Sequence, residues 1–294
     1  MIPGPFEYHR PHTKDEAFSL LEKYGDEGRI LAGGHSLIPM MKLRMAVPEN
    51  IIDIQSIADL KGISISSNTI EIGALTTQHE IIHSKELEAA CPILKEAALL
   101  IADPQIRYCG TVGGNVANGD PGNDMPALMQ CLNAKFIVEN ASGEREIFAR
   151  EFYHSAYFTA LEEGEIVTKI SIPTPASSSG YAYEKMKRKV GDYATAASAV
   201  LLTMNGSQCS SASIALTNVG DIPLYAEEAS SILVGAPLGN RGSDAAAIIN
   251  KAIGSLEAIC EPAADARGSA EYRTKMAGQM TRQAINSALS RAQS

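Results

Sequence analysis

Two segments of this chain each carry a pair of adjacent glycines beside hydroxyl and amide side chains. The first, Ala32 to Ser36 (AGGHS), follows a short apolar strand-like run and precedes an apolar helical turn at 37–43. The second, Thr111 to Asn115 (TVGGN), lies in a glycine-rich stretch at 103–123. Glycine adopts positive φ and lets the backbone approach another group closely. These two segments restrict the folds that the chain can adopt, because both need an unusual backbone path.

The first segment suits an anionic ligand, and the Thr and Asn side chains of the second suit a polar ligand. Successive N–H groups at a helix N-terminus bind a group such as a pyrophosphate, and Ser36 adds a hydroxyl donor. The stretch 103–123 is predicted to lack regular structure, and a long irregular loop in a compact domain is usually functional. The alternative is a tight turn with no ligand. Neither segment is a G-x-G-x-x-G motif and no G-x-x-x-x-G-K-[ST] motif occurs, so a simple NAD or ATP fold is disfavoured.

The pattern of apolar residues predicts an α+β fold. A first domain at 1–175 combines an N-terminal βαβ subdomain (about 1–55) with a central mixed-sheet subdomain (about 56–175). The run TPASSSG at 174–180 is the predicted linker. A second domain at 180–294 contains a three-stranded antiparallel sheet followed by helices. The expected strands are 6–9, 29–32, 51–54, 64–73 (a hairpin), 136–138, 146–148, 166–172, 181–189, 196–204 and 209–217, and the expected helices include 13–25, 76–83, 92–102, 227–233, 244–259 and 270–292.

Charge and composition exclude several classes of protein. The chain has 25 Lys and Arg against 34 Asp and Glu, a net charge of -9 that argues against nucleic-acid binding. No run approaches the roughly 20 apolar residues of a transmembrane helix. The start MIPGPFEYHR lacks the features of a signal peptide, so a cytoplasmic location is expected.

Metal sites are not expected in this chain. Its five cysteines are widely spaced without a CxxC pair, which excludes a local zinc or iron–sulfur pattern. His79 and His83 share a helix face at i, i+4, but no third ligand has a suitable spacing.

The two glycine segments resemble those of the FAD-binding subunits of molybdenum hydroxylases, a family that includes xanthine dehydrogenase and aldehyde-type dehydrogenases. The longer strings AGGHSLIPMMKLRMA, IADPQIRYCGTVGGNVANGDPGNDMPALMQCL and YEKMKRKVGDYATAA are similar to the carbon monoxide-oxidising branch of this family. The resemblance covers essentially the whole chain, including EYRTKMAG near its end. It implies non-covalent FAD, although His35 stands where distantly related oxidases attach their flavin.

The resemblance also implies partners. The molybdenum cofactor is expected on a large subunit and the [2Fe-2S] clusters on a small subunit, within a dimer of heterotrimers. This chain would carry electrons from the clusters through FAD to a quinone-type acceptor, with peripheral contact at the inner face of the membrane. Arg107 and Tyr108 are predicted interface anchors, because arginine and tyrosine are enriched at interfaces.

Individual residues follow from the same resemblance. The first segment is expected to hold the pyrophosphate with backbone donors, and the second is expected to contact the diphosphate and ribityl region. Asp124 is expected to contact FAD, and Tyr193 is expected to cover one face of the isoalloxazine. Lys185, or Lys187 if the alignment slips, is expected near the flavin, where a cation favours the reduced form. No catalytic residue and no metal ligand is predicted. The expected FAD-binding residues are Ala32, Gly33, Gly34, His35, Ser36, Leu37, Ile101, Thr111, Val112, Gly113, Gly114, Asn115, Asp124, Val167, Lys185 and Tyr193.

Several of these residues also have a purely structural interpretation. Lys185, Lys187 and Lys189 alternate along a strand and form a solvated face in one interpretation. Tyr193 is then a packed tyrosine and Asp124 only a helix N-cap. At the level of function, the alternatives are a related molybdenum hydroxylase acting on a heterocycle or an aldehyde, a stand-alone flavin oxidase, and a non-catalytic assembly subunit.

Overall fold

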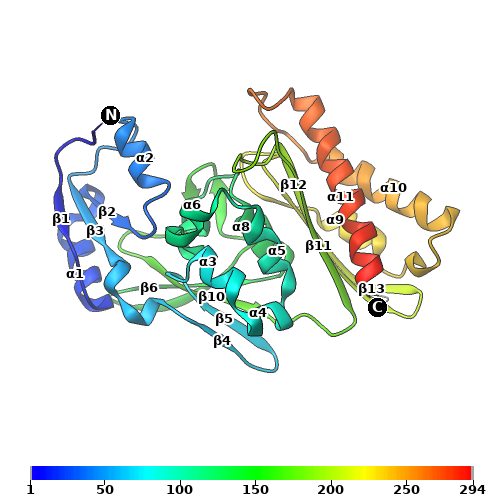
Figure 1. The fold of residues 1–294 in the computed structure, drawn as a ribbon, viewed down its shortest axis with the longest axis horizontal. Helices are drawn as coiled ribbons and strands as arrows, with labels where there is room; N and C mark the ends of the chain where they lie inside the picture. The colour runs from blue at the N-terminus through cyan, green and yellow to red at the C-terminus, as the bar shows by residue number, and fades with distance from the viewer. Residues whose placement is uncertain (1, 293–294) are drawn as a thin grey trace.

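The computed structural model of the protein describes residues 2–292. Three main sheets follow one another along the chain, from the N-terminal block at the left of Figure 1 to the helical C-terminal block at the right. The first predicted domain begins at residue 1 and the second ends at residue 294. Residue 1 and residues 293–294 lie outside the described residues. The fold is α+β, as predicted.

The N-terminal block is the predicted βαβ arrangement. Its three strands are parallel in the order β1-β3-β2. Helix α1 buries Ala17 and Phe18 in the same hydrophobic cluster as Ile52 of β3 and ends at Gly25, which has φ 48°. The elements are β1 (Glu7–His9), α1 (Lys14–Tyr24), β2 (Gly28–Leu31), α2 (Leu37–Lys42) and β3 (Asn50–Asp53).

The central sheet has the order β4-β5-β10-β6-β7. All of its pairings are antiparallel, so the prediction of a mixed sheet was wrong. The reason is that two hairpins supply four strands, and β10 enters between them antiparallel to both neighbours. The strands are β4 (Ile63–Ile65), β5 (Thr69–Gly73), β6 (Lys135–Asn140), β7 (Gly143–Phe148) and β10 (Ile166–Pro173), with a small separate pair β8 (Tyr153–Ser155) and β9 (Phe158–Thr159).

Residues 103–123 are largely helical, so the prediction of an irregular loop was also wrong. Asp103 caps one helix by accepting from Ile106 N at 3.0 Å, and Thr111 caps the next by accepting from Gly114 N at 3.1 Å. In the second of these helices, the cap and the burial of Val112 and Val116 outweigh the low helix propensity of its two glycines. The helices of this region are α3 (Gln78–His83), α4 (Lys85–Ala90), α5 (Pro92–Leu100), α6 (Pro104–Cys109), α7 (Val112–Ala117) and α8 (Asp124–Cys131).

The C-terminal sheet has four antiparallel strands rather than three, because the two residues of β14 add to the edge of β13. Its first strand begins inside the predicted linker. Gly180 of this strand pairs with Leu202, and a Cβ added to it would lie 1.8 Å from Ala288 O of the last helix, so only glycine fits there. The elements are β11 (Ser179–Met186), β12 (Ala196–Asn205), β13 (Gln208–Thr217), β14 (Leu224–Tyr225), α9 (Glu227–Leu233), α10 (Ser243–Ala258) and α11 (Ala270–Ala292).

Both faces of this sheet are covered. Tyr183 and Ala199 pack into the core that α5, α8 and the central sheet share, whereas Ala182 and Val200 pack against the C-terminal helices. Alternate residues of a strand point to opposite faces, which explains the division. Figure 1 shows the sheet standing between α5 and α8 on one side and α9, α10 and α11 on the other. Strand β11 therefore connects the first domain to the second. Within residues 2–292, no helix has the length and apolar character to cross a bilayer.

Candidate functional site

The two glycine segments lie against each other. A Cβ added to Gly33 would be 2.3 Å from Cys109 O and 2.8 Å from Gly110 Cα, and one added to Gly114 would be 3.6 Å from Ala32 Cβ. Such distances exclude a side chain at position 33, because the approach is to backbone. The fold therefore joins the end of β2 to the junction of α6 and α7, which are about 80 residues apart in the sequence.

The first segment offers free hydrogen-bond donors. The five successive N–H groups of 33–37 donate to no other group in the part of the chain that the structure describes. Gly34 has φ +75°, and the Ser36 hydroxyl makes no capping bond to α2. Successive unpaired N–H groups in such a turn form an anion-binding concavity. The donors present fit the diphosphate of FAD.

The second segment uses its backbone differently from the first. Its N–H groups are already bonded inside the protein: Val112 N to Thr76 O at 2.9 Å, Gly113 N to Ala74 O at 2.8 Å, and Gly114 N to Thr111 Oγ1. A Cβ at Gly113 would lie 2.4 Å from Ala74 Cβ, so this glycine is needed for packing.

The second segment therefore has polar side chains, rather than N–H groups, to offer a ligand. The Thr111 hydroxyl accepts one hydrogen bond and can still donate one to a ligand. The Asn115 amide nitrogen has no acceptor within residues 2–292, while its Oδ1 accepts from Met125 N at 3.3 Å. Hydroxyl and amide groups recognise the polar parts of a nucleotide.

Asp124 and Lys185 meet in a buried ion pair. Lys185 Nζ lies 2.7 Å from Asp124 Oδ2 and 3.2 Å from Leu100 O, and its side chain is 1% exposed. Tyr183 OH donates to Asp124 Oδ1 at 2.6 Å. Asn123, not Asp124, occupies the N-cap position of α8, so the interpretation of Asp124 as a cap was wrong. This cluster joins α8 to β11, and burial beside Asp124 raises the pKa of Tyr183 well above its usual value.

The three lysines at 185–189 do not form one solvated face. Lys185 is buried in the ion pair, strand β11 ends at Met186, and Lys189 is exposed. Lys187 is partly buried near the pair, and burial together with the charge of Lys185 lowers its pKa. The two candidate lysines thus lie close together, one paired and the other without an ion-pair partner in the described part of the chain.

Tyr193 lies against Gly122, near the end of the glycine-rich stretch 103–123. A Cβ on Gly122 would be 2.9 Å from its ring carbon Cδ1. The residue is 44% exposed, so it is not a core tyrosine. Removal of the phenol from water and the nearby charge of Asp120 raise its pKa to about 12.

The two predicted pocket-lining residues are both buried. Ile101 follows α5, directly after the Leu100 carbonyl that binds Lys185. Val167 precedes Thr168, whose carbonyl accepts from the N–H of Ala74, so its strand lies next to the second segment. The Val167 side chain itself belongs to the hydrophobic core.

Sequence reasoning missed three residues near the site. Tyr183 stands two positions before Lys185 on strand β11, so the two side chains point to the same face of the sheet. This alternation could have identified Tyr183 from the sequence. Asp120 lies in the glycine-rich stretch that was singled out. Tyr157, whose pKa is raised by burial and by Asp120, had no local signal, because only tertiary folding brings it there.

The two histidines at i, i+4 pack with each other and with a tyrosine. The His79 and His83 rings pack at 4.0 Å, and Tyr108 stacks on His79 at 3.9 Å. Residues 2–292 contain no cluster of three His, Cys, Asp or Glu side chains suited to a metal ion.

Two family descriptions match the chain. Residues 4–175 match the FAD binding domain in molybdopterin dehydrogenase, and residues 181–288 match the CO dehydrogenase flavoprotein C-terminal domain. Among proteins of similar sequence, the carbon monoxide dehydrogenase medium chain of Afipia carboxidovorans is 57% identical over 99% of each chain. That of Hydrogenophaga pseudoflava is 48% identical, again over 99% of each chain.

A solved structure is similar over the same length. Reconstituted CO dehydrogenase from Oligotropha carboxidovorans contains a chain that is 57% identical, with a TM-score of 0.95 over 99% of this chain and 100% of the other. Both the sequence and the arrangement of all three sheets are therefore shared.

Proposed function

The chain belongs to the family of FAD-binding medium subunits of molybdenum hydroxylases, in its carbon monoxide dehydrogenase branch, and we propose that it carries electrons from [2Fe-2S] clusters of a partner to an external acceptor. It is an oxidoreductase subunit whose cofactor is FAD. The observation that supports the proposal most directly is the contact between the two glycine segments, since it presents free N–H donors beside Thr111 and Asn115.

Each element of the site has a proposed task. The N–H groups of 33–37 hold the diphosphate, and the side chains of Thr111 and Asn115 hold the sugar-alcohol region. Tyr193 covers one face of the ring system and excludes water there. FAD, when bound, exchanges electrons both singly and in pairs.

The charges near the ring are proposed to act as a group. Asp124 neutralises most of the field of Lys185, because the two charged atoms are only 2.7 Å apart. Lys187 has no such partner in the described residues, so it supplies the net positive charge. A fixed cation near the site of developing negative charge favours the reduced cofactor.

The proposed partners are an iron–sulfur small subunit and a molybdenum large subunit, in a dimer of heterotrimers. Tyr108, which is 60% exposed at the end of α6, is the proposed anchor of the electron-donating partner. Arg107 is engaged inside the chain instead. Its Nη1 donates to Ile101 O at 2.8 Å and so caps the end of α5.

The proposed substrate of the whole complex is carbon monoxide, oxidised on the large subunit, and the proposed acceptor is a quinone. Full-length identity of 57% to a carbon monoxide dehydrogenase medium chain supports this choice over a heterocycle or an aldehyde. No residue of this chain is assigned to chemistry on the substrate.

The test is the absorption spectrum of the complex purified through this chain, with the released cofactor identified. FAD together with iron–sulfur absorption, and bleaching on addition of CO, is the expected result. Bleaching of the isolated chain by an organic substrate would instead identify a stand-alone flavin oxidase. An intact complex without flavin would make the glycine segments structural and the chain an assembly subunit.

A further inference from the structure

Tyr193 is held by a loop with little regular structure of its own. Residues 187–195 connect β11 to β12, and their main-chain bonds are Asp192 N to Lys189 O at 3.3 Å and Thr195 N to Met186 O at 2.7 Å. Val190 at the tip is 83% exposed. A loop with so few internal bonds requires outside contacts to keep a side chain in one place.

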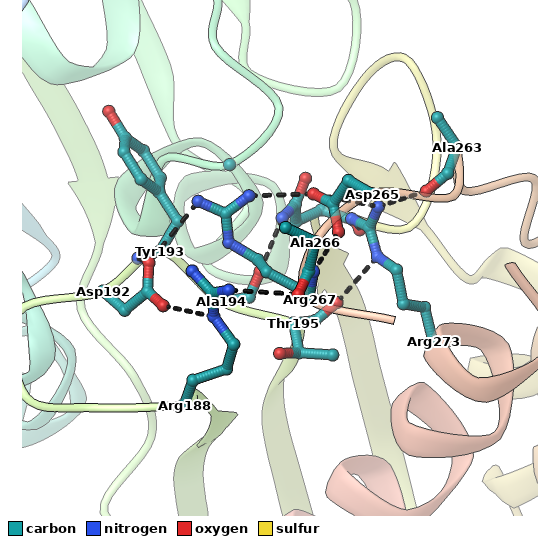
Figure 2. Close-up of polar contacts among 12 residues, drawn as sticks. Arg188, Asp192, Tyr193, Ala194, Thr195, Ala263, Asp265, Ala266, Arg267 and Arg273 are labelled. Atoms are coloured by element: carbon teal, nitrogen blue, oxygen red, sulfur yellow. Dashed lines mark hydrogen bonds and ion pairs between the residues drawn. The ribbon is translucent and has the colours of Figure 1, made fainter. Parts of the chain in front are cut away.

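Asp192 makes such outside contacts. Its Oδ2 accepts from Arg188 Nε at 2.9 Å, and its Oδ1 accepts from Tyr193 N at 2.9 Å and from Arg267 Nη2 at 3.4 Å. The Asp192 side chain is only 7% exposed, and Arg188 above all holds its pKa below the usual value. Figure 2 shows Asp192 between the two arginines, directly before Tyr193.

Arg267 comes from the segment 259–269, between α10 and α11, about 70 residues further along the chain. Its Nη1 donates to Asp265 Oδ2 at 2.8 Å, and its guanidinium carbon lies 5.6 Å from the centre of the Tyr193 ring. At that distance a cation is attracted to the face of a tyrosine. Arg267 therefore contacts both the carboxylate before Tyr193 and the tyrosine ring.

The segment that carries Arg267 is itself anchored to the core. Arg273 of α11, which is buried, donates to the carbonyls of Ala263, Thr195 and Asn218. Asn218 N in turn donates to Pro121 O at 2.9 Å, next to the Gly122 that the Tyr193 ring contacts. As Figure 2 shows, the guanidinium of Arg273 reaches both the segment with Ala263 and the end of the loop at Thr195.

We propose that Arg267 is a positioning residue for Tyr193: by holding Asp192 and the tyrosine ring, it keeps the loop 187–195 in the conformation that places the ring over Gly122. This inference rests on the proposed function, in which the Tyr193 ring covers the cofactor. It adds that the C-terminal domain, through Arg267, controls the environment of a cofactor bound by the N-terminal domain.

The experiment compares Arg267→Ala, Arg267→Lys, Asp192→Asn and Tyr193→Ala in the complete complex. Arg241→Ala is the matched control, because Arg241 belongs to the same domain and donates to Ser290 Oγ, outside this network. FAD content, the visible absorption and fluorescence of the flavin, and amide hydrogen exchange of residues 187–195 are measured for each variant.

Arg267→Ala is expected to retain FAD, because the donors at 33–37 are untouched. Amide exchange in 187–195 should rise by about tenfold, the usual consequence of losing hydrogen bonds to a charged group. The flavin spectrum should shift toward that of Tyr193→Ala, and combining the two substitutions should add nothing further. Arg267→Lys should recover part of the change, since lysine restores the charge but not the two-pronged geometry. Asp192→Asn should resemble Arg267→Ala, while Arg241→Ala stays at the wild-type value.

The outcomes separate the two proposals. A spectrum changed by Tyr193→Ala but unchanged by both Arg267→Ala and Asp192→Asn would overturn the positioning role and leave the proposed function intact. A wild-type complex without FAD would overturn the proposed function, and the positioning role with it. A loss of thermal stability with the flavin spectrum unchanged would make Arg267 merely structural and would also refute the proposal.

Discussion

Replacement of Lys185 by methionine tests the buried ion pair directly. The change removes the ammonium group and leaves the Asp124 carboxylate, 6% exposed, with only the hydroxyl of Tyr183 as a partner. Removing one member of a buried pair costs about 3–5 kcal/mol. For a chain of 294 residues with an unfolding entropy of roughly 2.1 cal/mol/K per residue, this corresponds to a decrease in Tm of about 5–8 °C.

The double variant separates charge from packing. Lys185→Met combined with Asp124→Asn removes both charges and keeps the approximate shapes, so it should recover most of the lost Tm. Lys169→Met is the surface control, because Lys169 and Glu71 are both about two-fifths exposed and such pairs contribute little. Thermal unfolding followed by circular dichroism measures all three. A double variant that is less stable than Lys185→Met would show that the carboxylate was never dependent on the lysine, and the reasoning would be wrong.

Three further predictions concern the glycine segments, Tyr193 and a thiol. Gly33→Val and Gly113→Val should abolish FAD binding, since the new side chains would meet Cys109 O and Ala74. The control Gly254→Ala, which has open space around it, should retain a full complement of FAD. Stoichiometric flavin in either valine variant would contradict the proposed site. The pKa of Tyr193 is about 12 in the folded protein against a usual 10. The stability that the protonated phenol contributes is therefore complete below pH 10 and is lost as the pH rises toward 12. A difference titration against Tyr193→Phe should show no Tyr193 phenolate at pH 10. Cys109 is the exposed thiol among the described residues and should react first with a thiol reagent, and a Cys109→Ser variant that labels as fast as wild type would refute this.

Much of the fold follows from local sequence signals. Asn205-Gly206 joins two apolar runs and forms the hairpin of β12 and β13, with Gly206 at φ 60°. The three C-terminal helices begin and end within one or two residues of the predicted limits. These features are local, because turn chemistry and apolar period are decided by neighbouring residues. Helix α7 was missed for the opposite reason, since its Gly113 and Gly114 disfavour a helix unless tertiary packing supports it.

The sequence by itself determined that the chain carries two glycine segments, an acidic residue, a lysine and a tyrosine in the pattern of an FAD-binding subunit. Only the tertiary structure decided what each of them contacts. Gly33 is a glycine because a backbone carbonyl about 75 residues away approaches it, and Lys185 is neutralised by Asp124 across the boundary between two domains. The proposed dependence of Tyr193 on Arg267 is likewise absent from any local pattern. Periodicity and turn propensity act over a few residues, whereas burial and ion pairing depend on which distant segments the fold brings together.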